Sequence, residues 1–450
     1  MMELLSPAGS REALIAAVQN GADAVYFGGS MFNARRFAAN FDDHGLISAI
    51  DYCHERGVKV NITLNTLLLD REISRALKYA EFLCRTGADA AIVQDMGLVS
   101  LIRKNIPELP LHASTQMGIH ELNGAREAEK LGLEQVVLSR EVPLGEIEYI
   151  HNNTPIALEA FAHGALCMSV SGQCYLSSVL GERSGNRGRC AQPCRLKYGW
   201  GNKADGSPLS LKDMSLAGHL RELRKMGVAC VKIEGRMKRP EYVAVVTGIY
   251  ARAIREGREP TAEELEQLRS AFSRDGFTDG YFLGQTGPEM FGTRQDEAEP
   301  RELFTQARAT YESGENRKEP VRMYAMLRRG EPAQVAVQDA QEHLRYQVPY
   351  FIWCNQSQEE QQLPLCGLND LQLYLAGQAG LPLTGYQKLL AQVAQRYPVV
   401  CAQGVMAADG SWLDEKQIAE DDLLSLYRTA VYAHMNEPER LENFWTYAAG

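Results

Sequence analysis

The stretch ELLSPAGSREALIAAVQNGADAVYFGG, residues 3–29, has the pattern of a strand, a helix and a second strand. Its two ends, ELLSPAG and DAVYFGG, are short apolar runs of the kind that form strands. Between them, REALIAAVQNG carries a helical pattern and ends in glycine just before the next strand, as helix C-caps do. This order predicts a βαβ unit, whose two strands are parallel.

Six more apolar runs follow, with helical patterns between most of them. They are VKVNITLN (58–65), DAAIVQD (89–95), LPLHAST (109–115), QVVLSRE (135–141), IALEAFAHG (156–164) and ACVKIEG (229–235). Strands this short and this apolar suit a parallel sheet that is buried on both faces. Eight such units in about 250 residues predict a (β/α)8 barrel. An open doubly wound sheet is the alternative, but no G-x-G-x-x-G motif follows the first strand.

The fold class expected is therefore α/β, with a TIM-like barrel over residues 1–287. The interval between strands seven and eight is long, and the helical pattern SLAGHLRELRKMG fills only its end. A cysteine-rich loop, residues 163–198, is thus inserted after strand seven, at the rim where barrel enzymes carry their active sites.

Two further segments follow the barrel. Residues 288–319 are polar and poorly periodic, and we predict a linker there. Residues 320–450 are predicted to form a smaller α+β accessory domain. Within it, PVRMYAMLRRGEPAQVAVQDA reads as a β-hairpin with RRGEP as its turn.

The bulk composition narrows the class of protein. A chain of 450 residues is too long for one ordinary core, and a net charge of −10 confines any nucleic-acid contact to local patches. No apolar run reaches the length of a membrane span, and MMELLSPAG lacks the features of a secretory signal. We expect a cytoplasmic protein with reduced thiols. Six scattered cysteines are then expected to be buried small residues: Cys53, Cys84, Cys230, Cys354, Cys366 and Cys401.

The other four cysteines lie within 28 residues, spaced C-x6-C-x15-C-x3-C: Cys167, Cys174, Cys190 and Cys194. Four thiolates bind zinc or an iron–sulfur cluster. Zinc sites usually use two tight knuckles, and the first gap here is too long for one. The spacing in a Gly- and Ser-rich loop therefore favours a [4Fe–4S] cluster, with zinc, or four thiols without metal, as the alternatives. The same loop carries five basic residues that would stabilise a cluster's negative charge: Arg183, Arg187, Arg189, Arg195 and Lys197.

Polar residues follow several predicted strands, where a barrel places its active site. Arg35, Arg140 and Arg236 could converge on an anionic ligand, because guanidinium pairs bidentately with carboxylate or phosphate. Asn65 and Gln116 are further candidates for substrate binding. Any one of them could equally be polar only because it reaches solvent.

Three residues at the strand ends are candidates for acid or base catalysis: Glu141, His163 and Glu234. Sequence alone does not decide which of them acts. Hydrolase motifs are missing, since the chain has neither H-E-x-x-H nor G-x-S-x-G. A thiol-protease dyad of Cys167 with His163 is an alternative, although Cys167 is better explained as a cluster ligand.

Three segments resemble the signature of the peptidase U32 family, the collagenase-like protease family. They are EAFAHGALCMSVSGQCYLS (159–177), RSGNRGRCAQPCR (183–195) and KIEGRMKRPEYV (232–243). The resemblance extends over roughly residues 2–285. The better-understood members of the family are RNA hydroxylation proteins, which make 5-hydroxyuridine in tRNA or 5-hydroxycytidine in 23S rRNA. A third group acts on ubiquinone precursors and places its cysteines differently.

The resemblance implies an oxygen-independent RNA hydroxylase with prephenate as hydroxyl donor. It also implies a [4Fe–4S] cluster held by the four cysteines of the loop. Prephenate is a dicarboxylate, which would explain the arginines, and the basic loop would hold tRNA or rRNA. Residues 320–450 match the C-terminal region of longer rRNA-type members weakly. The family name offers a peptidase as the alternative, and a metal-stabilised scaffold that only binds a partner is a third reading.

Overall fold

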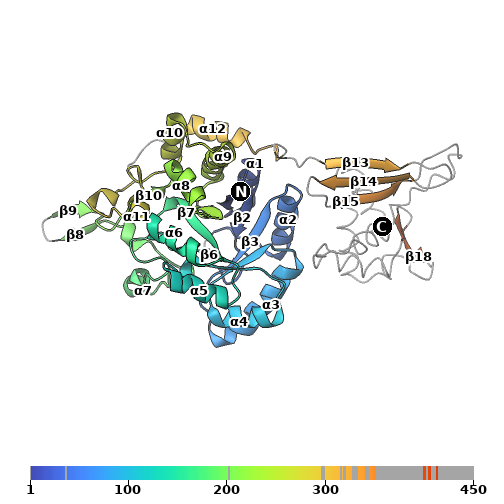
Figure 1. The fold of residues 1–450 in the computed structure, drawn as a ribbon, viewed down its shortest axis with the longest axis horizontal. Coiled ribbons are helices and arrows are strands. Elements are labelled where there is room, and N and C mark those ends of the chain that lie inside the picture. Colours follow the sequence, from blue (N-terminus) through green and yellow to red (C-terminus); the bar gives the residue numbers. More distant parts are fainter. Residues whose placement is uncertain are drawn as a thin grey trace. The chain divides into compact units, whose positions relative to one another are not determined.

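The chain folds into two compact units, residues Met1–Lys318 and Glu319–Gly450. Figure 1 shows the ribbon of this computed structural model. The structure describes residues 2–35, 38–200, 203–294, 299–314 and 317, and six strands of the second unit. Within the described residues, no helix combines the length and the hydropathy needed to span a bilayer.

Eight parallel strands form a closed barrel in the first unit (Figure 1). They are β1 (Glu3–Pro7), β2 (Ala24–Phe27), β3 (Lys59–Leu64), β4 (Ala90–Val93), β5 (Leu111–Ala113), β6 (Gln135–Val137), β7 (Ala157–Ala165) and β11 (Cys230–Ile233). Each strand pairs with the next, and β11 closes the ring by pairing in parallel with both β1 and β7. The predicted (β/α)8 barrel is confirmed, and the open sheet is excluded.

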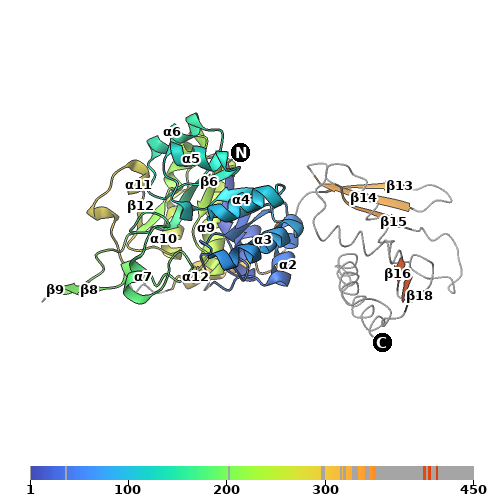
Figure 2. The same ribbon diagram turned by 90° about the horizontal axis from the view of Figure 1, so that it is seen from below.

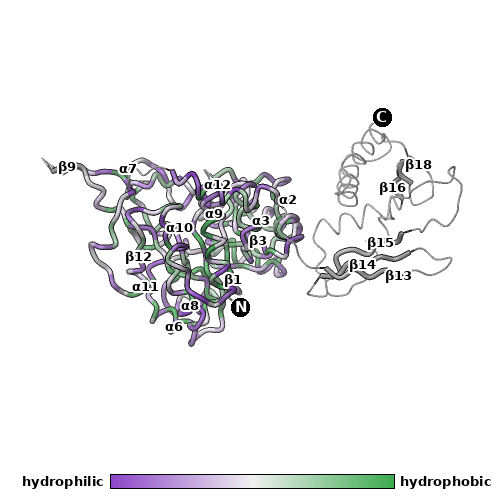
Figure 3. The backbone as a smooth tube through the Cα atoms, turned by 90° about the horizontal axis from the view of Figure 1, so that it is seen from above, coloured by the Kyte–Doolittle hydropathy of each residue, from purple (hydrophilic) through white to green (hydrophobic). Residues whose placement is uncertain are grey.

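Helices surround the barrel, as Figure 2 shows from a second direction. They are α1 (Arg11–Gln19), α2 (Asp43–His54), α3 (Asp70–Arg85), α4 (Met96–Asn105), α5 (Leu122–Lys130), α6 (Leu144–Asn153), α8 (Leu220–Lys225) and α9 (Pro240–Glu256). Ser10, Asp42 and Asp95 begin three of them, because each side chain accepts a hydrogen bond from a backbone N–H of the first turn. The strands are buried on both faces, and Figure 3 shows hydrophobic segments running through the interior of the unit.

The insertion between β7 and β11 contains α7 (Leu176–Gly181), the hairpin of β8 (Tyr198–Trp200) and β9 (Lys203–Gly206), and β10 (Asp213–Ser215). Strand β10 runs antiparallel to the end of β7, and the short β12 (Phe277–Thr278) pairs with β10. The cysteine-rich loop therefore leaves and rejoins the barrel at the end of β7. The sequence did not predict β10, whose three residues are too few to show a period.

The described residues of the segment expected to be a linker, 288–319, instead pack on the barrel unit. The segment contains helix α12 (Arg301–Ala309), which contacts α9 and α10 (Ala262–Ala271). Phe304, Ala307 and Tyr311 of this segment are buried in the core. The linker prediction is wrong here because α12 buries only two of its nine residues, too few to reveal a helical period in a polar sequence.

The second unit is described through its strands. Strands β13 (Val321–Met326), β14 (Ala333–Asp339) and β15 (Leu344–Tyr350) form an antiparallel sheet, and β16 (Val399–Cys401), β17 (Gly404–Met406) and β18 (Trp412–Leu413) form another. Pairing of β13 with β14 confirms the predicted hairpin. Its RRGEP turn, Cys354 and Cys366 lie outside the described residues. Of the other scattered cysteines, Cys53 and Cys230 are buried as expected, and Cys84 is partly buried.

Candidate active site

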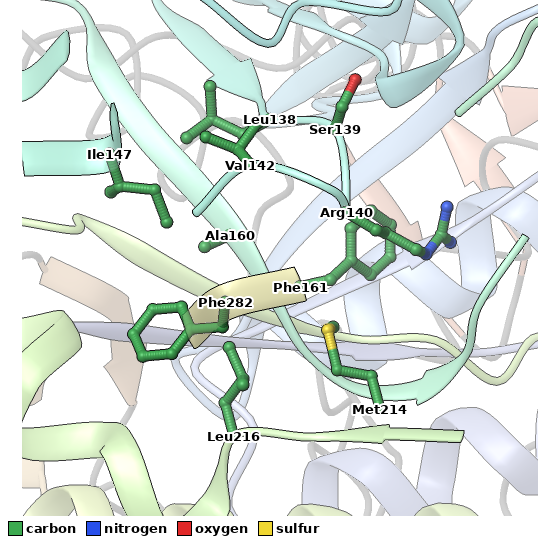
Figure 4. A pocket seen from close by; sticks show the side chains of 10 residues that line it. All are labelled: Leu138, Ser139, Arg140, Val142, Ile147, Ala160, Phe161, Met214, Leu216 and Phe282. Carbon is green, nitrogen blue, oxygen red and sulfur yellow. The ribbon is translucent and has the colours of Figure 1, made fainter. Parts of the chain in front are cut away.

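Glu234 is the centre of a charged cluster at the barrel mouth. It follows β11, and its two carboxylate oxygens accept hydrogen bonds from the guanidinium groups of Arg35, at 3.3 Å, and Arg140, at 2.7 Å. Arg140 follows β6 and lies over the Phe161 ring of β7, 3.8 Å from its centroid. Figure 4 shows this pair beside a small cavity whose other walls are largely apolar. The ends of separate strands thus bring three of the predicted site residues together.

Arg236 supplies a third guanidinium to the cluster. It is buried, it donates to the Thr63 hydroxyl at 2.9 Å, and its guanidinium carbon lies 5.7 Å from the Tyr26 ring centroid. Burial and the nearby charge of Arg35 lower the pKa of Arg236 to about 10, so it remains a cation at neutral pH. The predicted convergence of Arg35, Arg140 and Arg236 is present in the structure.

The charges of this cluster do not balance. Burial alone would raise the pKa of Glu234, but Arg35, Arg140 and Arg236 outweigh it and lower that pKa to about 2. Glu234 is therefore an anion at neutral pH and has no proton to give as a general acid. Three guanidinium groups against one carboxylate leave two positive charges unbalanced at a mostly buried site. Such a site favours a dianionic ligand.

Asn65 and Gln116 have backbone-ordering contacts. The Asn65 side chain accepts from the Ala34 backbone N–H at 3.0 Å, next to Arg35, and donates to Ser114 at 3.3 Å. The Gln116 carbonyl accepts from the Gln94 side chain at 3.1 Å. The Asn65 contacts position the loop that carries Arg35, whereas the Gln116 contact is made by its backbone carbonyl and leaves its side chain a candidate for substrate binding.

Glu141 holds the base of the cysteine-rich loop. Its carboxylate accepts from the Ser171 backbone N–H at 2.9 Å and from the Ser171 hydroxyl at 3.0 Å. Next to it, Gly172 has φ +78° and packs so closely on Gln116 that a Cβ would lie 2.6 Å from the Gln116 Cα. The structure therefore places Glu141 at the loop anchor, where its oxygens are occupied.

His163 is in the wall of the barrel and not among the side chains around Glu234. Its ring is buried, packs edge-on against Tyr250 and Phe277, and contacts the Tyr250 hydroxyl at 3.3 Å through Nδ1. Burial lowers the pKa of His163 to about 3, so the ring is neutral. No hydrogen bond joins it to Cys167 in the part of the chain described. The proposed thiol–histidine dyad is absent from this arrangement.

The four cysteines of the loop lie close enough for their charges to interact. Cys167, Cys174 and Cys190 are exposed, and Cys194 is partly buried. Burial raises the pKa of Cys194; Arg195 opposes this, and the other three cysteines raise the pKa further. The charge of Cys167 also acts on Arg35, which connects the thiols to the charged mouth.

The loop has features that suit a group larger than one ion. Gly185 leaves space where a Cβ would lie 3.6 Å from the Cys174 carbonyl oxygen and 3.7 Å from the Cys190 Cβ. The Gln192 backbone N–H donates to the Cys190 sulfur at 3.3 Å, a contact that tunes iron–sulfur sites. Among the described side chains, no three His, Cys, Asp or Glu are arranged to hold a single metal ion. The four cysteines are the residues of this loop that could hold a metal centre.

Two of the loop's basic residues serve the loop itself. Arg187 donates to both oxygens of Glu72 at 2.8 and 2.6 Å, and Arg195 donates to the Leu166 carbonyl at 2.5 Å and to the Ser210 hydroxyl at 3.1 Å. Their guanidinium groups are thereby occupied. The expectation that the whole basic loop faces RNA does not hold for Arg187 and Arg195.

Sequence reasoning passed over a second group of cations. Lys238, in the quoted segment KIEGRMKRPEYV, lies with Arg274 and Arg294 around Phe272. Burial, together with Arg274 and Arg294, lowers the pKa of Lys238 to about 7. The only signal in the sequence was the density of basic residues in GRMKRP.

Comparison with known proteins gives three informative relatives. The chain is 41% identical over 293 residues to the 23S rRNA 5-hydroxycytidine C2501 synthase of Escherichia coli, covering 63% of this chain and 43% of that protein. It is 36% identical to a collagenase of Porphyromonas gingivalis, covering 63% and 74%. It is 33% identical to tRNA hydroxylation protein P1 of Bacillus subtilis, covering 64% and 73%.

The chain thus spans less than half the length of the Escherichia coli relative, and about three quarters of the other two. The sequence model of peptidase family U32 matches residues 9–291, which include the barrel from α1 onward, the cysteine-rich loop and the charged mouth. The chain belongs to peptidase family U32.

Proposed function

We propose that this protein is an oxygen-independent, iron–sulfur-dependent hydroxylase that adds a hydroxyl at C5 of a pyrimidine in tRNA or 23S rRNA. The observation that carries the proposal is the meeting of two features at one barrel mouth. One is a loop with four interacting thiols, and the other is a buried guanidinium cluster with two unbalanced positive charges. Two of the three relatives described above are named for RNA hydroxylation, which supports the class of reaction.

Cys167, Cys174, Cys190 and Cys194 would hold a [4Fe–4S] cluster. The hydroxyl donor would give up hydroxide as its C–O bond breaks, with aromatisation of its ring and loss of CO2. Exchange of C–H for C–OH on the base with that hydroxide releases the ring proton and two electrons. A bound cluster would supply a path for these electrons, one at a time, to an external one-electron acceptor. The chain's own residues position this loop. Glu141 fixes Ser171 at its start, and Arg187 fixes its middle to Glu72.

The guanidinium cluster would bind the hydroxyl donor, for which we propose prephenate. A dicarboxylate neutralises the two excess charges of Arg35, Arg140 and Arg236. Glu234 keeps the guanidinium groups of Arg35 and Arg140 oriented before the ligand arrives. Its permanent negative charge also disfavours a ligand that carries more than two negative charges.

The decisive test combines metal analysis with RNA analysis. Protein purified without oxygen should contain four irons and four acid-labile sulfides per chain, and RNA from a strain that lacks the gene should miss one hydroxylated pyrimidine. Replacing Cys190 with Ser should abolish the cluster and the RNA hydroxylation. Cys53→Ser, which alters a buried cysteine outside the loop, should leave both unchanged.

The other outcomes separate the alternatives. Zinc without iron would make the loop structural and leave a binding scaffold as the better reading. Peptide cleavage that persists after iron is chelated, with all RNA hydroxyls intact, would favour the peptidase. The buried, neutral His163 argues against that result, because it does not pair with Cys167.

A further inference from the structure

Phe272 carries three cations, contributed by three separate segments of the chain. The guanidinium of Arg294 lies 4.5 Å and that of Arg274 5.0 Å from its ring centroid, and the Lys238 ammonium lies over the same ring. An aromatic face attracts cations through its quadrupole, so the ring holds like charges together that would otherwise repel.

The backbone around this ring is fixed by hydrogen bonds. The Gly292 N–H donates to the Ser210 carbonyl at 2.9 Å, and the Lys212 N–H donates to the Met290 carbonyl at 2.8 Å. A Cβ on Gly292 would lie 2.5 Å from the Arg274 carbonyl oxygen, so only glycine lets the two segments touch. Arg294 follows this contact by two residues. Backbone hydrogen bonds and this close contact therefore fix the segments that carry the cations.

The patch has an excess of positive charge. Arg274 is paired with the buried Asp213 at 2.6 Å, and the second oxygen of Asp213 has no partner. Among the residues described, no carboxylate forms an ion pair with Lys238 or Arg294. The groups that act on Lys238 are Asp213 and Glu234, which raise its pKa, and Arg274 and Arg294, which lower it. Within the described part of the chain, Lys238 and Arg294 can therefore pair with an external anion.

The patch lies at the rim of the mouth. Lys238 follows Glu234 by four residues, and the charge of Glu234 acts on it. Asp213 pairs with Ala165 at the end of β7, where the cysteine-rich loop begins. A polyanion that contacts this patch would therefore run alongside the charged cluster and the thiols.

We propose that Lys238 and Arg294, held around Phe272 beside the Asp213-paired Arg274, form an anchor for the phosphates of a single-stranded RNA whose base enters the mouth. This inference rests on the proposed function and identifies where the RNA backbone binds. Guanidinium and ammonium groups are the usual partners of phosphate, and single-strand sites combine them with aromatic rings. The anchor adds to the basic loop, two of whose cations are occupied internally.

The test is a salt titration of RNA affinity with the full-length protein purified without oxygen. The probe is a fluorescein-labelled single-stranded RNA of mixed sequence, followed by anisotropy. Arg294→Gln removes an exposed charge whose only contact described above is with the Phe272 ring and its cations, and Lys238→Gln removes the second. Lys104→Gln, an exposed residue in the last turn of α4, at the opposite end of the barrel, is the matched control.

Loss of one phosphate contact should reduce the slope of log affinity against log salt by about 0.7 and weaken binding about fourfold near physiological salt. We expect this for Arg294→Gln and no change for Lys104→Gln. The double variant should lose further slope, by less than the same amount again at pH 7, because the pKa of Lys238 is about 7 and its ammonium is only partly protonated there. Variants with unchanged slope and affinity would overturn the anchor. So would variants that bind RNA normally but have a weakened affinity for prephenate, since the patch would then be a carboxylate site.

The anchor and the proposed function fail in different ways. If the unaltered protein binds the RNA but Arg294→Gln and Lys238→Gln do so equally well, only the anchor is wrong. If the unaltered protein binds no RNA and deletion of its gene leaves every RNA hydroxyl in place, the proposed function is wrong as well.

Discussion

Two charged groups differ in their charge balance: one lies between β7 and β11 inside the barrel, and the other lies just beyond the end of β11 at the mouth. Inside the barrel, Lys232 pairs with Glu159 at 2.7 Å, and both side chains are buried. At the mouth, Glu234 meets Arg35 and Arg140, with Arg236 beside them. The inner pair is neutral, and Gln135 satisfies the second oxygen of Glu159 at 2.5 Å. The outer group keeps two positive charges that no described residue cancels.

This difference in charge balance distinguishes an ion pair that stabilises the fold from a cluster that can bind a ligand. A buried pair with equal and opposite charges closes the barrel interior and leaves no excess charge for a ligand. A buried group with excess charge can be neutralised only by something that binds. A structural ion pair thus lies between β7 and β11 in the interior, and a candidate binding site begins at Glu234, the first residue beyond β11.

The largest expected effect comes from breaking the inner pair. Lys232→Met leaves the Glu159 carboxylate buried without its cation, and the free energy of unfolding should fall by about 3–5 kcal/mol. Denaturant titration measures this loss. The control is Lys59→Met, which removes the partner of Glu3 at the surface and should cost less than about 1 kcal/mol. Equal losses in the two variants would show that the inner pair is not a structural centre.

The charged cluster at the mouth should make the free energy of unfolding depend on pH. The pKa of Glu234 is lowered in the folded state from 4.5 to about 2. Its contribution is therefore complete above the unfolded pKa and is lost as the pH falls through the folded one. The shift corresponds to about 3 kcal/mol. Glu234→Gln should remove that part of the acid sensitivity, measured by unfolding at a series of pH values between 5 and 2.

Glu127→Gln is the matched control for this experiment, because Glu127 forms only an exposed pair with Lys130. Its acid sensitivity should follow that of the unaltered protein. If Glu234→Gln also follows the unaltered protein, the three arginines do not hold the charge of Glu234 as the geometry indicates.

The smallest expected effect is on ligand affinity. Arg140→Gln removes one of the charge-assisted hydrogen bonds available to a dicarboxylate, which corresponds to about 10- to 100-fold weaker binding of prephenate. Isothermal titration calorimetry measures this change. Arg85→Gln alters an exposed pair on α3 and should bind as the unaltered protein does. Unchanged affinity in Arg140→Gln would remove the dicarboxylate from the proposal.

Much of the mouth could be predicted because strand ends in a barrel converge. Arg35, Arg140, Arg236 and Glu234 each follow a strand that the apolar runs had located, so their meeting required no knowledge of side-chain packing. His163 was predicted by the same rule, and its placement differs. The pairing of β7 with β11 is irregular between Lys232 and Ile233, and the end of β7 also pairs with β10. His163 consequently faces Tyr250 of α9.

The cysteine-rich loop shows a second limit of prediction from the sequence. Its four thiols were recognisable from residue type and spacing alone. The partners of its basic residues could not be predicted, because Arg187 pairs with Glu72, which lies 115 residues earlier in the chain. Likewise, Phe272 gathers Lys238, Arg274 and Arg294 from separate segments with no motif in common.

The sequence by itself determined the eight strands, the place of the inserted loop and the residue types at the mouth, because apolar periodicity and spacing are local properties. Only the tertiary structure decided which charges are balanced and which are not. Balance depends on partners that are far apart in the chain, as with Lys232 and Glu159, and on burial, which fixes the ionisation of Glu234 and His163.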